Sequence, residues 1–326
     1  MKLGIIGGGA WGTALAQVAS ADSRETLIWA MESEVVRSIN ERHENPAFLP
    51  GVRLNDSVRA TGDIGEVRDR DALLVVTPAQ HMRGLLEQAP VADKPLILCA
   101  KGIEEQSGRL LHQIAIEACP GAPIAVLSGP TFAHEVAKGL PTAVTLAAQD
   151  LGLAERLRDR IARPTFRIYV SDDVAGAEIG GAVKNVLAIA CGVVEGRSLG
   201  QNARAALIAR GFAELRRFGL AFGAKLETLS GLAGLGDLIL TCSSTSSRNY
   251  SLGLGIGQGR AAAELLSNRK TVAEGAFTAP VLARLAREKG VEMPIVDAVE
   301  ALVSGRSNVD EVLDGLLSRP PRAEGV

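Results

Sequence analysis

The sequence predicts an α/β protein with two parts, a doubly wound parallel sheet followed by an all-helical C-terminal domain. Two observations support this. Through the first half of the chain, short apolar runs alternate with helical stretches, which is the pattern of a parallel sheet covered by helices. After Asp173 such runs end, and apolar residues recur at helical spacing instead. A chain of 326 residues is also longer than one average domain.

The first expected element is a buried strand over Leu3–Ile6, which runs directly into a glycine-rich turn. Gly7, Gly9 and Gly12 have the spacing G-x-G-x-x-G, and Thr13–Ala21 has helical composition. Strand, glycine turn and helix together indicate a dinucleotide-binding, Rossmann-like fold. Gly7 permits the tight turn, Gly9 lets the backbone approach a pyrophosphate, and Gly12 lets helix and strand pack closely. The alternative is a turn without a ligand, but its place after the first strand favours binding.

The second strand is expected over Thr26–Trp29, and Glu32 lies just beyond it. In this fold a carboxylate near that point holds the adenosine ribose. Ser33–Arg42 is predicted to be a helix, with Ser33 as its N-cap. Asn45–Leu54 contains two prolines and a glycine and is predicted to be a loop.

Three continuous apolar runs predict the central strands of the parallel sheet. Because ligands of such sheets bind at the carboxyl ends of the strands, the residues after these runs should share one rim with the glycine turn. Two further runs extend the sheet. The central strands are Ala72–Val76, Leu96–Ala100 and Ile124–Leu127, the helices between them lie near Gln80–Glu87 and Gly108–Ala118, and the further runs are Ala143–Ala147 and Phe166–Val170.

The second domain is expected to begin within several residues of Ser171. This divides the chain into a dinucleotide-binding domain over residues 1–172 and a helical substrate and catalytic domain over residues 173–326. The predicted helices of the second domain are Val174–Val194, Ala203–Phe218, Arg248–Gly257, Ala273–Lys289 and Ile295–Val303.

The segment Glu178–Cys191 is small and apolar at nearly every position except Lys184 and Asn185. A helix that is apolar all round is usually buried, so a lysine inside it must snorkel, pair or lie at a cleft. Burial lowers the pKa of an ammonium group, which suits proton transfer near neutral pH. A structural lysine that reaches solvent is the alternative. Gly180 and Gly181, which suggest a close approach to the backbone, favour the functional interpretation.

Composition excludes several classes of function. The 35 Lys and Arg residues are balanced by 37 Asp and Glu, and aromatic residues make up 3%, so nucleic-acid binding is not expected. The four cysteines lack metal-ligand or redox spacing and are predicted to be reduced core residues, and no cluster suggests a metal. No signal peptide is recognisable, and no uninterrupted apolar run is long enough to cross a bilayer. We therefore expect a cytoplasmic protein without a membrane partner.

Several short motifs follow one another along the chain. They are Gly7–Gly12, Ala100–Ile103, Ser128–Ala133, Gly180–Asn185, Gly200–Arg204, Gly231–Leu238 with Thr241 and Cys242, and Ser247–Asn249. In this order they resemble the bacterial NAD(P)-dependent glycerol-3-phosphate dehydrogenase family, from the first strand to about Pro294. Each motif alone is moderately specific, whereas the ordered set is highly specific.

The resemblance implies reduction of dihydroxyacetone phosphate to sn-glycerol 3-phosphate, and the reverse, with NAD or NADP as cofactor. It also implies a role in supplying glycerol 3-phosphate for phospholipid synthesis. Lys184 matches the family's proton acceptor, Lys101 a second lysine near the nicotinamide, and Asp237 a substrate-site carboxylate. Two neighbouring ammonium groups would lower each other's pKa. Asp237 would form an ion pair with Lys184, accept from a substrate hydroxyl, or merely cap the helix after Gly236.

The resemblance also implies which residues hold the phosphate and the cofactor. Arg248, with Ser247 and Asn249, matches the phosphate-contacting group, since arginine suits bidentate phosphate recognition and Ser247 is placed to cap a helix. The predicted substrate contacts are Lys101, Gly129, Thr131, Lys184, Asp237, Ser247, Arg248 and Asn249. The predicted cofactor contacts are Gly7, Gly9, Ala10, Trp11, Gly12, Met31, Lys101, Ala133, Arg248, Val272 and Glu274.

Departures from the family pattern bear on the choice of cofactor. Ala10 and Trp11 stand where many members have a serine and another aromatic residue, and Met31 stands where members often carry His or Arg. Met31 has no charge to pair with the 2′-phosphate of NADPH, and Glu32 beside it would repel that phosphate. Arg37 is the only nearby cation that could compensate for this repulsion. We therefore expect NADH to be used well and NADPH not to be preferred.

Two alternatives stay open at this point. One is another two-domain dehydrogenase with a Lys-Asn pair, of the β-hydroxyacid or 6-phosphogluconate type, and Ser247–Asn249 argues against it. The other is a dinucleotide-binding sensor without catalysis, and the intact Lys101, Lys184 and Asp237 argue against that. The oligomeric state is also open, with a homodimer as one alternative.

Overall fold

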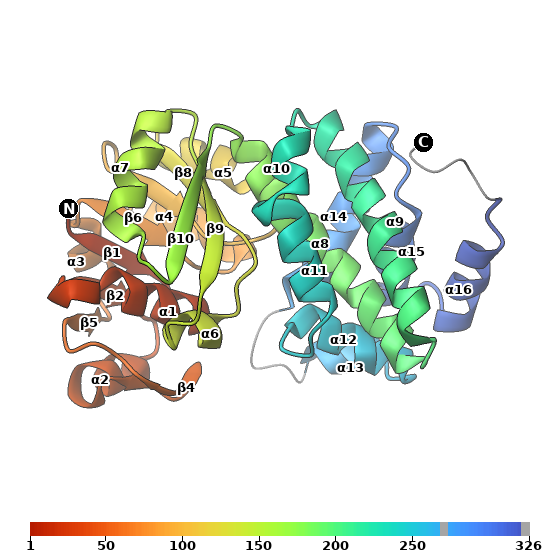
Figure 1. Ribbon diagram of the computed structural model, residues 1–326, viewed down its shortest axis with the longest axis horizontal. Coiled ribbons are helices and arrows are strands. Elements are labelled where there is room, and N and C mark those ends of the chain that lie inside the picture. The colour runs from red at the N-terminus through yellow and green to blue at the C-terminus, as the bar shows by residue number, and fades with distance from the viewer. Residues whose placement is uncertain (268–272, 321–326) are drawn as a thin grey trace. The chain divides into compact units, whose positions relative to one another are not determined.

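The computed structural model describes residues 1–267 and 273–320. The chain forms two compact units. The first comprises Met1–Ala100 and Leu111–Ala177, and the second comprises Lys101–Leu110 and the chain from Glu178 onward. The large sheet lies in the first unit and the long helices lie in the second (Figure 1). The predicted fold class, a Rossmann-like sheet domain followed by a helical domain, is confirmed.

The first unit contains an eight-stranded sheet with the order β10-β9-β8-β7-β6-β1-β2-β5. The strands are β1 (Leu3–Ile6), β2 (Thr26–Trp29), β5 (Val58–Thr61), β6 (Ala72–Val75), β7 (Leu96–Leu98), β8 (Ile124–Ser128), β9 (Thr142–Ala147) and β10 (Phe166–Ser171). The neighbouring strands are parallel, except that β8 and β9 are antiparallel. The prediction of a wholly parallel sheet was therefore wrong at this pair. The connection there contains only the short helix α6 (Ala133–Ala137), which packs on α1 (Ala10–Ala19) instead of crossing back over the sheet.

Helices cover both faces of this sheet, as a doubly wound fold requires. Leu3 and Ile5 point to the face covered by α1, whereas a Cβ on Gly4 would lie 2.7 Å from Val67 of α3. The other helices of the unit are α1 (Ala10–Ala19), α2 (Ser33–Arg42), α3 (Ile64–Arg68), α4 (Met82–Gln88), α5 (Leu111–Ala118) and α7 (Leu151–Ile161), with 3-10 turns at η1 (Ala21–Ser23) and η2 (Ala79–His81).

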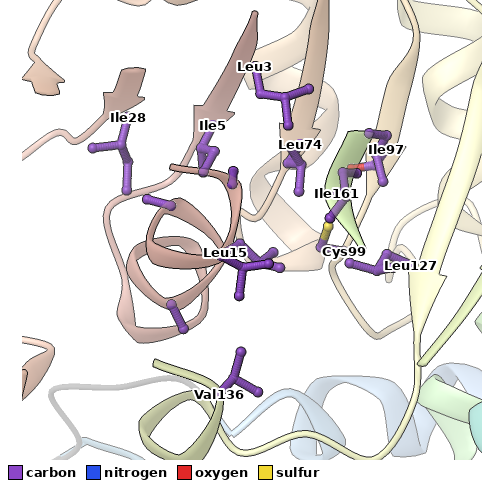
Figure 2. Close-up of a cluster of buried hydrophobic side chains, with 14 of the residues drawn as sticks. Leu3, Ile5, Leu15, Ile28, Leu74, Ile97, Cys99, Leu127, Val136 and Ile161 are labelled. Carbon is purple, nitrogen blue, oxygen red and sulfur yellow. The ribbon is translucent and has the colours of Figure 1, made fainter. Parts of the chain in front are cut away.

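One large apolar cluster fixes the position of α1 against the sheet (Figure 2). Leu15 of α1 packs in this cluster with side chains from five strands, β1, β2, β6, β7 and β8, and from α6 and α7. They include Leu3, Ile5, Ile28, Leu74, Ile97, Leu127, Val136 and Ile161. Burial of each such side chain contributes about 1.5–3 kcal/mol. Because α1 begins at the glycine turn, this core also holds the turn in place.

Two local predictions for the first unit were wrong, and one strand was missed. The expected loop Asn45–Leu54 instead contains β4 (Leu49–Arg53), which pairs with β3 (Glu44–Asn45). The buried Asn45 amide holds this segment by donating to the Gly8 carbonyl at 2.9 Å and to Thr13 Oγ1 at 2.8 Å. Strand β5 was missed because it is a short edge strand that depends on pairing with β2. Helix α2 begins at Ser33, so Glu32, not Ser33, is at the N-cap position.

In the second unit, the predicted helices all occur, together with shorter ones that periodicity did not reveal. The predicted helices correspond to α8 (Val174–Gly196), α9 (Gly200–Ala221), α12 (Arg248–Gly257), α14 (Glu274–Glu288) and α15 (Pro294–Val303). The shorter ones are α10 (Leu226–Ser230), the π-helical turn η3 (Leu232–Gly236), α11 (Asp237–Cys242), α13 (Ala262–Ser267) and α16 (Val309–Leu317). The close approach predicted at Gly180 is real, since a Cβ there would lie 2.3 Å from the Ala233 carbonyl oxygen.

Helix α8 is long and apolar enough to cross a membrane, judged by length and composition alone within the described part of the chain. However, 94% of its most apolar window is buried inside the protein. The helix also carries the buried polar residues Glu178, Lys184 and Asn185. It is therefore the central core helix of the second unit, as the sequence predicted.

Candidate active site

The glycine turn of the first unit has the geometry of a phosphate-binding loop. Gly7 has a φ of +126°, which favours glycine. A Cβ on Gly12 would lie 1.9 Å from the Gly7 carbonyl oxygen, whereas a Cβ on Gly9 would meet nothing within 4 Å. Gly12 therefore permits the packing of helix against turn, and Gly9 leaves its backbone open to a ligand.

The N-terminus of α1 is also suited to an anion. Its N-cap, Gly9, supplies no side-chain hydrogen bond, and its first turn holds no acidic residue. The first N–H groups of a helix have no intrahelical partner, so they are available to phosphate oxygens. Together with the open backbone at Gly9, this arrangement fits the pyrophosphate of a dinucleotide.

The other predicted contacts in the first unit follow strand ends. Ala10 and Trp11 form the first turn of α1, and Met31 lies just beyond β2 with 79% of its surface exposed. Gly129 and Thr131 follow β8, and Ala133 begins α6. The structure thus places these residues at the carboxyl ends of β1, β2 and β8, where ligands of such sheets bind.

The second unit contains a buried cluster of two lysines around one carboxylate. Lys184 Nζ lies 2.6 Å from Asp237 Oδ1, and Lys101 Nζ lies 2.6 Å from Asp237 Oδ2. Asp237 is fully buried, Lys184 is 6% exposed, and the Lys101 side chain keeps 17% of its surface accessible. Of the alternatives for Asp237, the structure has the ion pair with Lys184. The alternative of a helix cap is wrong, because Gly236 is the N-cap of α11 and no side chain caps this helix.

Thr241 completes the surroundings of Lys184. Its Oγ1 lies 2.8 Å from Lys184 Nζ and 3.3 Å from Asp237 Oδ1. Burial lowers the pKa of Lys184 to about 8, opposed by Asp237 and assisted by the positive charge of Lys101. The effect of the Lys101 charge on the pKa of Lys184 therefore has the predicted direction. A lysine with this pKa exchanges a proton readily near neutral pH.

A chain of amide hydrogen bonds joins this cluster to two helices. Asn185 Nδ2 donates to the Lys101 carbonyl oxygen at 3.3 Å, and Asn249 Nδ2 donates to Asn185 Oδ1 at 3.0 Å. Asn249 Oδ1 in turn accepts from the backbone N–H of Gly275 at 2.9 Å. The Asn249 amide, predicted as a phosphate contact, thus also connects α12 to the start of α14.

The remaining predicted residues lie at the starts of α12 and α14. Ser247 is the N-cap of α12 and accepts from the Tyr250 N–H at 3.2 Å, as predicted. Arg248 is exposed at the first helical position. Although part of the side chain is exposed, the protein around the Arg248 guanidinium desolvates it and lowers its pKa, and the Glu274 carboxylate at the start of α14 opposes that effect. Val272 lies outside the described residues.

Two polar residues at this site were not assigned a role from the sequence. Thr241 lies four residues after Asp237, which places both on one face of a helix, and this spacing was the available signal. Asn185 was recognised beside Lys184, but its bond to Lys101 depends on a segment 84 residues away.

The four cysteines lie at Cys99, Cys119, Cys191 and Cys242. All four are free and buried, as predicted, and a hydrogen bond from the Cys242 thiol to Cys191, together with burial, raises the pKa of Cys242. Within residues 1–267 and 273–320, no group of three or more His, Cys, Asp or Glu side chains is placed to hold a metal ion.

Models of a known protein family match both parts of the chain. The NAD-dependent glycerol-3-phosphate dehydrogenase N-terminus matches residues 2–154, and the C-terminus of the same family matches residues 173–314. The chain belongs to this family. The family, the dehydrogenase class and the nicotinamide cofactor predicted from the sequence are thereby confirmed.

Individual relatives match over nearly their whole length. The glycerol-3-phosphate dehydrogenase (NAD(P)+) of Erythrobacter litoralis is 61% identical over 99% of this chain and 98% of the relative. The enzyme of the same name from Novosphingobium aromaticivorans is 62% identical, with the same coverage. The crystal structure of glycerol-3-phosphate dehydrogenase from Coxiella burnetii has a TM-score of 0.93 and 35% identity, over 98% of this chain and 99% of that chain. The glycerol-3-phosphate dehydrogenase fold therefore extends over both units.

Proposed function

We propose that this protein interconverts dihydroxyacetone phosphate and sn-glycerol 3-phosphate, with NAD or NADP as the hydride carrier. The observation that supports this most directly is the buried cluster of Lys184, Asp237 and Lys101, in a chain whose relatives are named for this enzyme. A bound nicotinamide supplies or accepts the hydride, while the protein provides position, charge and a proton.

Lys184 is proposed as the proton donor and acceptor. In the oxidation, neutral Lys184 takes the proton of the C2 hydroxyl, and in the reduction its ammonium group returns a proton to the C2 oxygen. A pKa of about 8 makes both forms accessible near neutral pH. Asp237 and Thr241 fix Lys184 Nζ in one position, because each lies within hydrogen-bond distance of it.

Lys101 is proposed to contact the substrate oxygen as a cation. Its ammonium group shares Asp237 with Lys184 but is more accessible to solvent. A positive charge there stabilises negative charge that develops on the C2 oxygen during hydride transfer. Asp237 carries one negative charge between two positive ones, so the cluster keeps a net positive charge suited to an anionic substrate.

Arg248 and the N-terminus of α12 are proposed to hold the substrate phosphate, with Ser247 and Asn249. An arginine fork and the free N–H groups of a helix start both suit phosphate oxygens. Arg248→Lys should reduce kcat/KM at least about tenfold for dihydroxyacetone phosphate, because the bidentate contact is lost. Unphosphorylated dihydroxyacetone should be affected much less. An equal loss with both substrates would assign Arg248 to the cofactor or the fold instead.

Gly129 and Thr131 are proposed as further substrate contacts. Ala133, Glu274 and Val272 are proposed as further cofactor contacts, in addition to the glycine turn with Ala10 and Trp11, Met31, Lys101 and Arg248.

NADH is proposed to be the better cofactor. Glu32 and Glu34 lie, exposed, at the start of α2, directly after β2 and Met31. Two carboxylates there would repel the 2′-phosphate of NADPH and accept from the ribose hydroxyls of NADH. Glu32→Ala should therefore improve kcat/KM for NADPH alone. A strong NADPH preference in the wild type, unchanged by the substitution, would contradict this proposal.

The decisive assay is the absorbance of NADH on addition of dihydroxyacetone phosphate. NADH should be oxidised with this substrate and not with the oxidation products of β-hydroxyacids. In the reverse direction, NAD should not be reduced by 6-phosphogluconate. Activity with those controls instead would favour the alternative two-domain dehydrogenase. In the cell, we propose a cytoplasmic enzyme that supplies glycerol 3-phosphate for phospholipid synthesis, with a small-molecule substrate and no nucleic-acid or membrane partner.

A further inference from the structure

Helix α8 and the π-helical turn η3 pass each other very closely beside the lysine–aspartate cluster. A Cβ on Gly180 of α8 would lie 2.3 Å from the carbonyl oxygen of Ala233 in η3 and 2.9 Å from the Cα of Gly234. Both distances are too short for a van der Waals contact, so the Ala233 carbonyl occupies the space that a side chain at position 180 would need. Backbone therefore meets backbone at this point, and Gly180 is the residue that allows it.

This contact lies just before the ion pair on both segments. Lys184 follows Gly180 by four residues, and Asp237 follows Ala233 by four residues. Residues four apart lie on the same face of an α-helix, about 6 Å apart along its axis. The two segments therefore run side by side in the same direction. The backbone contact is at one level, and the ion pair of Lys184 and Asp237 is at the next.

The separation of the two backbones matters because an aspartate side chain is short. Asp237 is fully buried, and both of its carboxylate oxygens are engaged. Oδ1 lies 2.6 Å from Lys184 Nζ, and Oδ2 lies 2.6 Å from Lys101 Nζ. The carboxylate reaches Lys184 only while the start of α11 stays close to α8. An increase in that separation would lengthen the ion pair and weaken the attraction between its charges.

The backbone of η3 is held by contacts on α8 and on α10. Within the turn, the Gly236 N–H donates to the Gly231 carbonyl, five residues earlier, at 3.0 Å. A Cβ on Gly234 would lie 1.9 Å from the carbonyl oxygen of Leu229 in α10. Because α11 follows η3 directly, these contacts also determine where Asp237 lies. Single π-helical turns of this kind are frequent at functional sites.

We propose that Gly180 is a positioning residue for proton transfer: it lets η3 approach α8 and thereby holds the Asp237 carboxylate against Lys184. Because Lys184 is the proposed proton carrier, this inference rests on the proposed function. Gly180 itself contacts neither substrate nor cofactor in this role and acts through Asp237. The sequence indicated only that something approaches the backbone at Gly180, whereas the structure identifies it as the turn that leads into the carboxylate.

The contact at Gly180 should also influence the protonation of Lys184. Burial lowers the pKa of Lys184 to about 8, and three groups on other segments act on it. Asp237 raises this pKa, Lys101 lowers it, and Cys242, whose thiol donates to Cys191 of α8, raises it. Asp237 has the largest effect of the three. If η3 moves away from α8, the carboxylate opposes the lowering less, so the pKa of Lys184 should fall further.

Gly180→Ala tests this role because it adds one methyl group and changes no charge. For oxidation of glycerol 3-phosphate, kcat should fall about ten- to hundredfold, since the ion pair that orients Lys184 is displaced. The apparent pKa in the pH profile of kcat should fall by about one unit, the direction expected for Asp237→Asn. The melting temperature should fall by about 5 °C, because the methyl group overpacks against a backbone atom.

Gly192→Ala is the matched control, because it creates a similar clash elsewhere on the same helix. A Cβ at Gly192 would lie 2.1 Å from the carbonyl oxygen of Tyr250, which belongs to α12 and not to η3. The melting temperature should fall as it does for Gly180→Ala. The apparent pKa of kcat should stay that of the wild type, because the contact between α8 and η3 is intact.

If Gly180→Ala does not fold, Ala233→Gly provides the test. It removes a buried methyl group from η3 and makes the same turn more flexible without a clash, so its apparent pKa should also fall, with a smaller loss of kcat. A wild-type pH profile in the variant that folds, or an equal shift in Gly192→Ala, would overturn the proposal. A profile that Asp237→Asn also leaves unchanged would instead count against Lys184 as the proton carrier, and therefore against the proposed function.

Discussion

The glycine turn of the first unit is suited to binding phosphate with backbone N–H groups, whereas the lysine–aspartate cluster of the second unit is suited to proton transfer with charged side chains. The turn presents backbone N–H groups from contiguous residues at the start of α1. The cluster presents charged side chains from segments 136 and 53 residues apart in sequence. The turn works because side chains are absent at Gly9 and Gly12, whereas the cluster works because Lys184 and Asp237 are buried together.

This difference determines how a mutation in each region should affect the protein. A change in the turn alters shape, so it should affect cofactor binding or folding before it affects proton transfer. A change in the cluster alters charge in a buried environment, so it should affect the chemical step and its pH dependence. Mutations in the two regions therefore have separable consequences.

The largest expected effect is the loss of Lys184. Lys184→Ala should lower kcat by roughly two to four orders of magnitude, the usual contribution of general acid–base catalysis. NADH affinity, measured by fluorescence titration, should be nearly unchanged, because the phosphate-binding turn lies in the other unit. Turnover near that of the wild type would exclude Lys184 as the proton carrier.

The next effect is expected from Gly12→Ala. The added methyl group would lie 1.9 Å from the Gly7 carbonyl oxygen, so turn and helix must separate. Overpacking against a backbone atom should cost about 3 kcal/mol in the free energy of unfolding and should abolish tight NADH binding. Chemical denaturation and fluorescence titration measure the two losses. A stable variant that binds NADH normally would show that α1 can shift without consequence.

The pH dependence of turnover should report Lys184. Oxidation of glycerol 3-phosphate needs neutral Lys184, so kcat should rise about tenfold per pH unit below a pKa of about 8 and level off above it. Reduction needs the ammonium form and should decline above the same pKa. Asp237→Asn removes the carboxylate that opposes the lowering of this pKa, so the residual activity profile should move to lower pH. A profile that does not move would mean that another group titrates.

The smallest effect is expected from Gly9→Ala. It separates cofactor binding from folding within the turn, because a Cβ is sterically tolerated at Gly9 but not at Gly12. Gly9 has a φ of −70° and a Cβ there would meet no atom within 4 Å. The free energy of unfolding should therefore change by less than about 0.5 kcal/mol. NADH affinity should still fall, by about tenfold, because the methyl group blocks the approach of the pyrophosphate. Equal affinities for wild type and variant would place the phosphate elsewhere.

Much of the framework was determined by the sequence alone. Continuous apolar runs predicted β1, β2, β6, β7 and β8, and the glycine spacing predicted the turn before α1. The apolar character of Glu178–Cys191 predicted a buried helix with Lys184 inside it. Ser247 was recognised as an N-cap from its place before a helical segment. These features depend on neighbours within a few residues, so local composition and periodicity contain the necessary information.

Other features were decided only by the tertiary structure, because they depend on residues far apart in the chain. The direction of β9 and the existence of β5 follow from which strand lies alongside, not from their own composition. The lowered pKa of Lys184 requires burial and the simultaneous presence of Asp237 and Lys101. Sequence patterns record what each segment can form, whereas long-range packing decides which of those segments meet and how strongly their charges are desolvated.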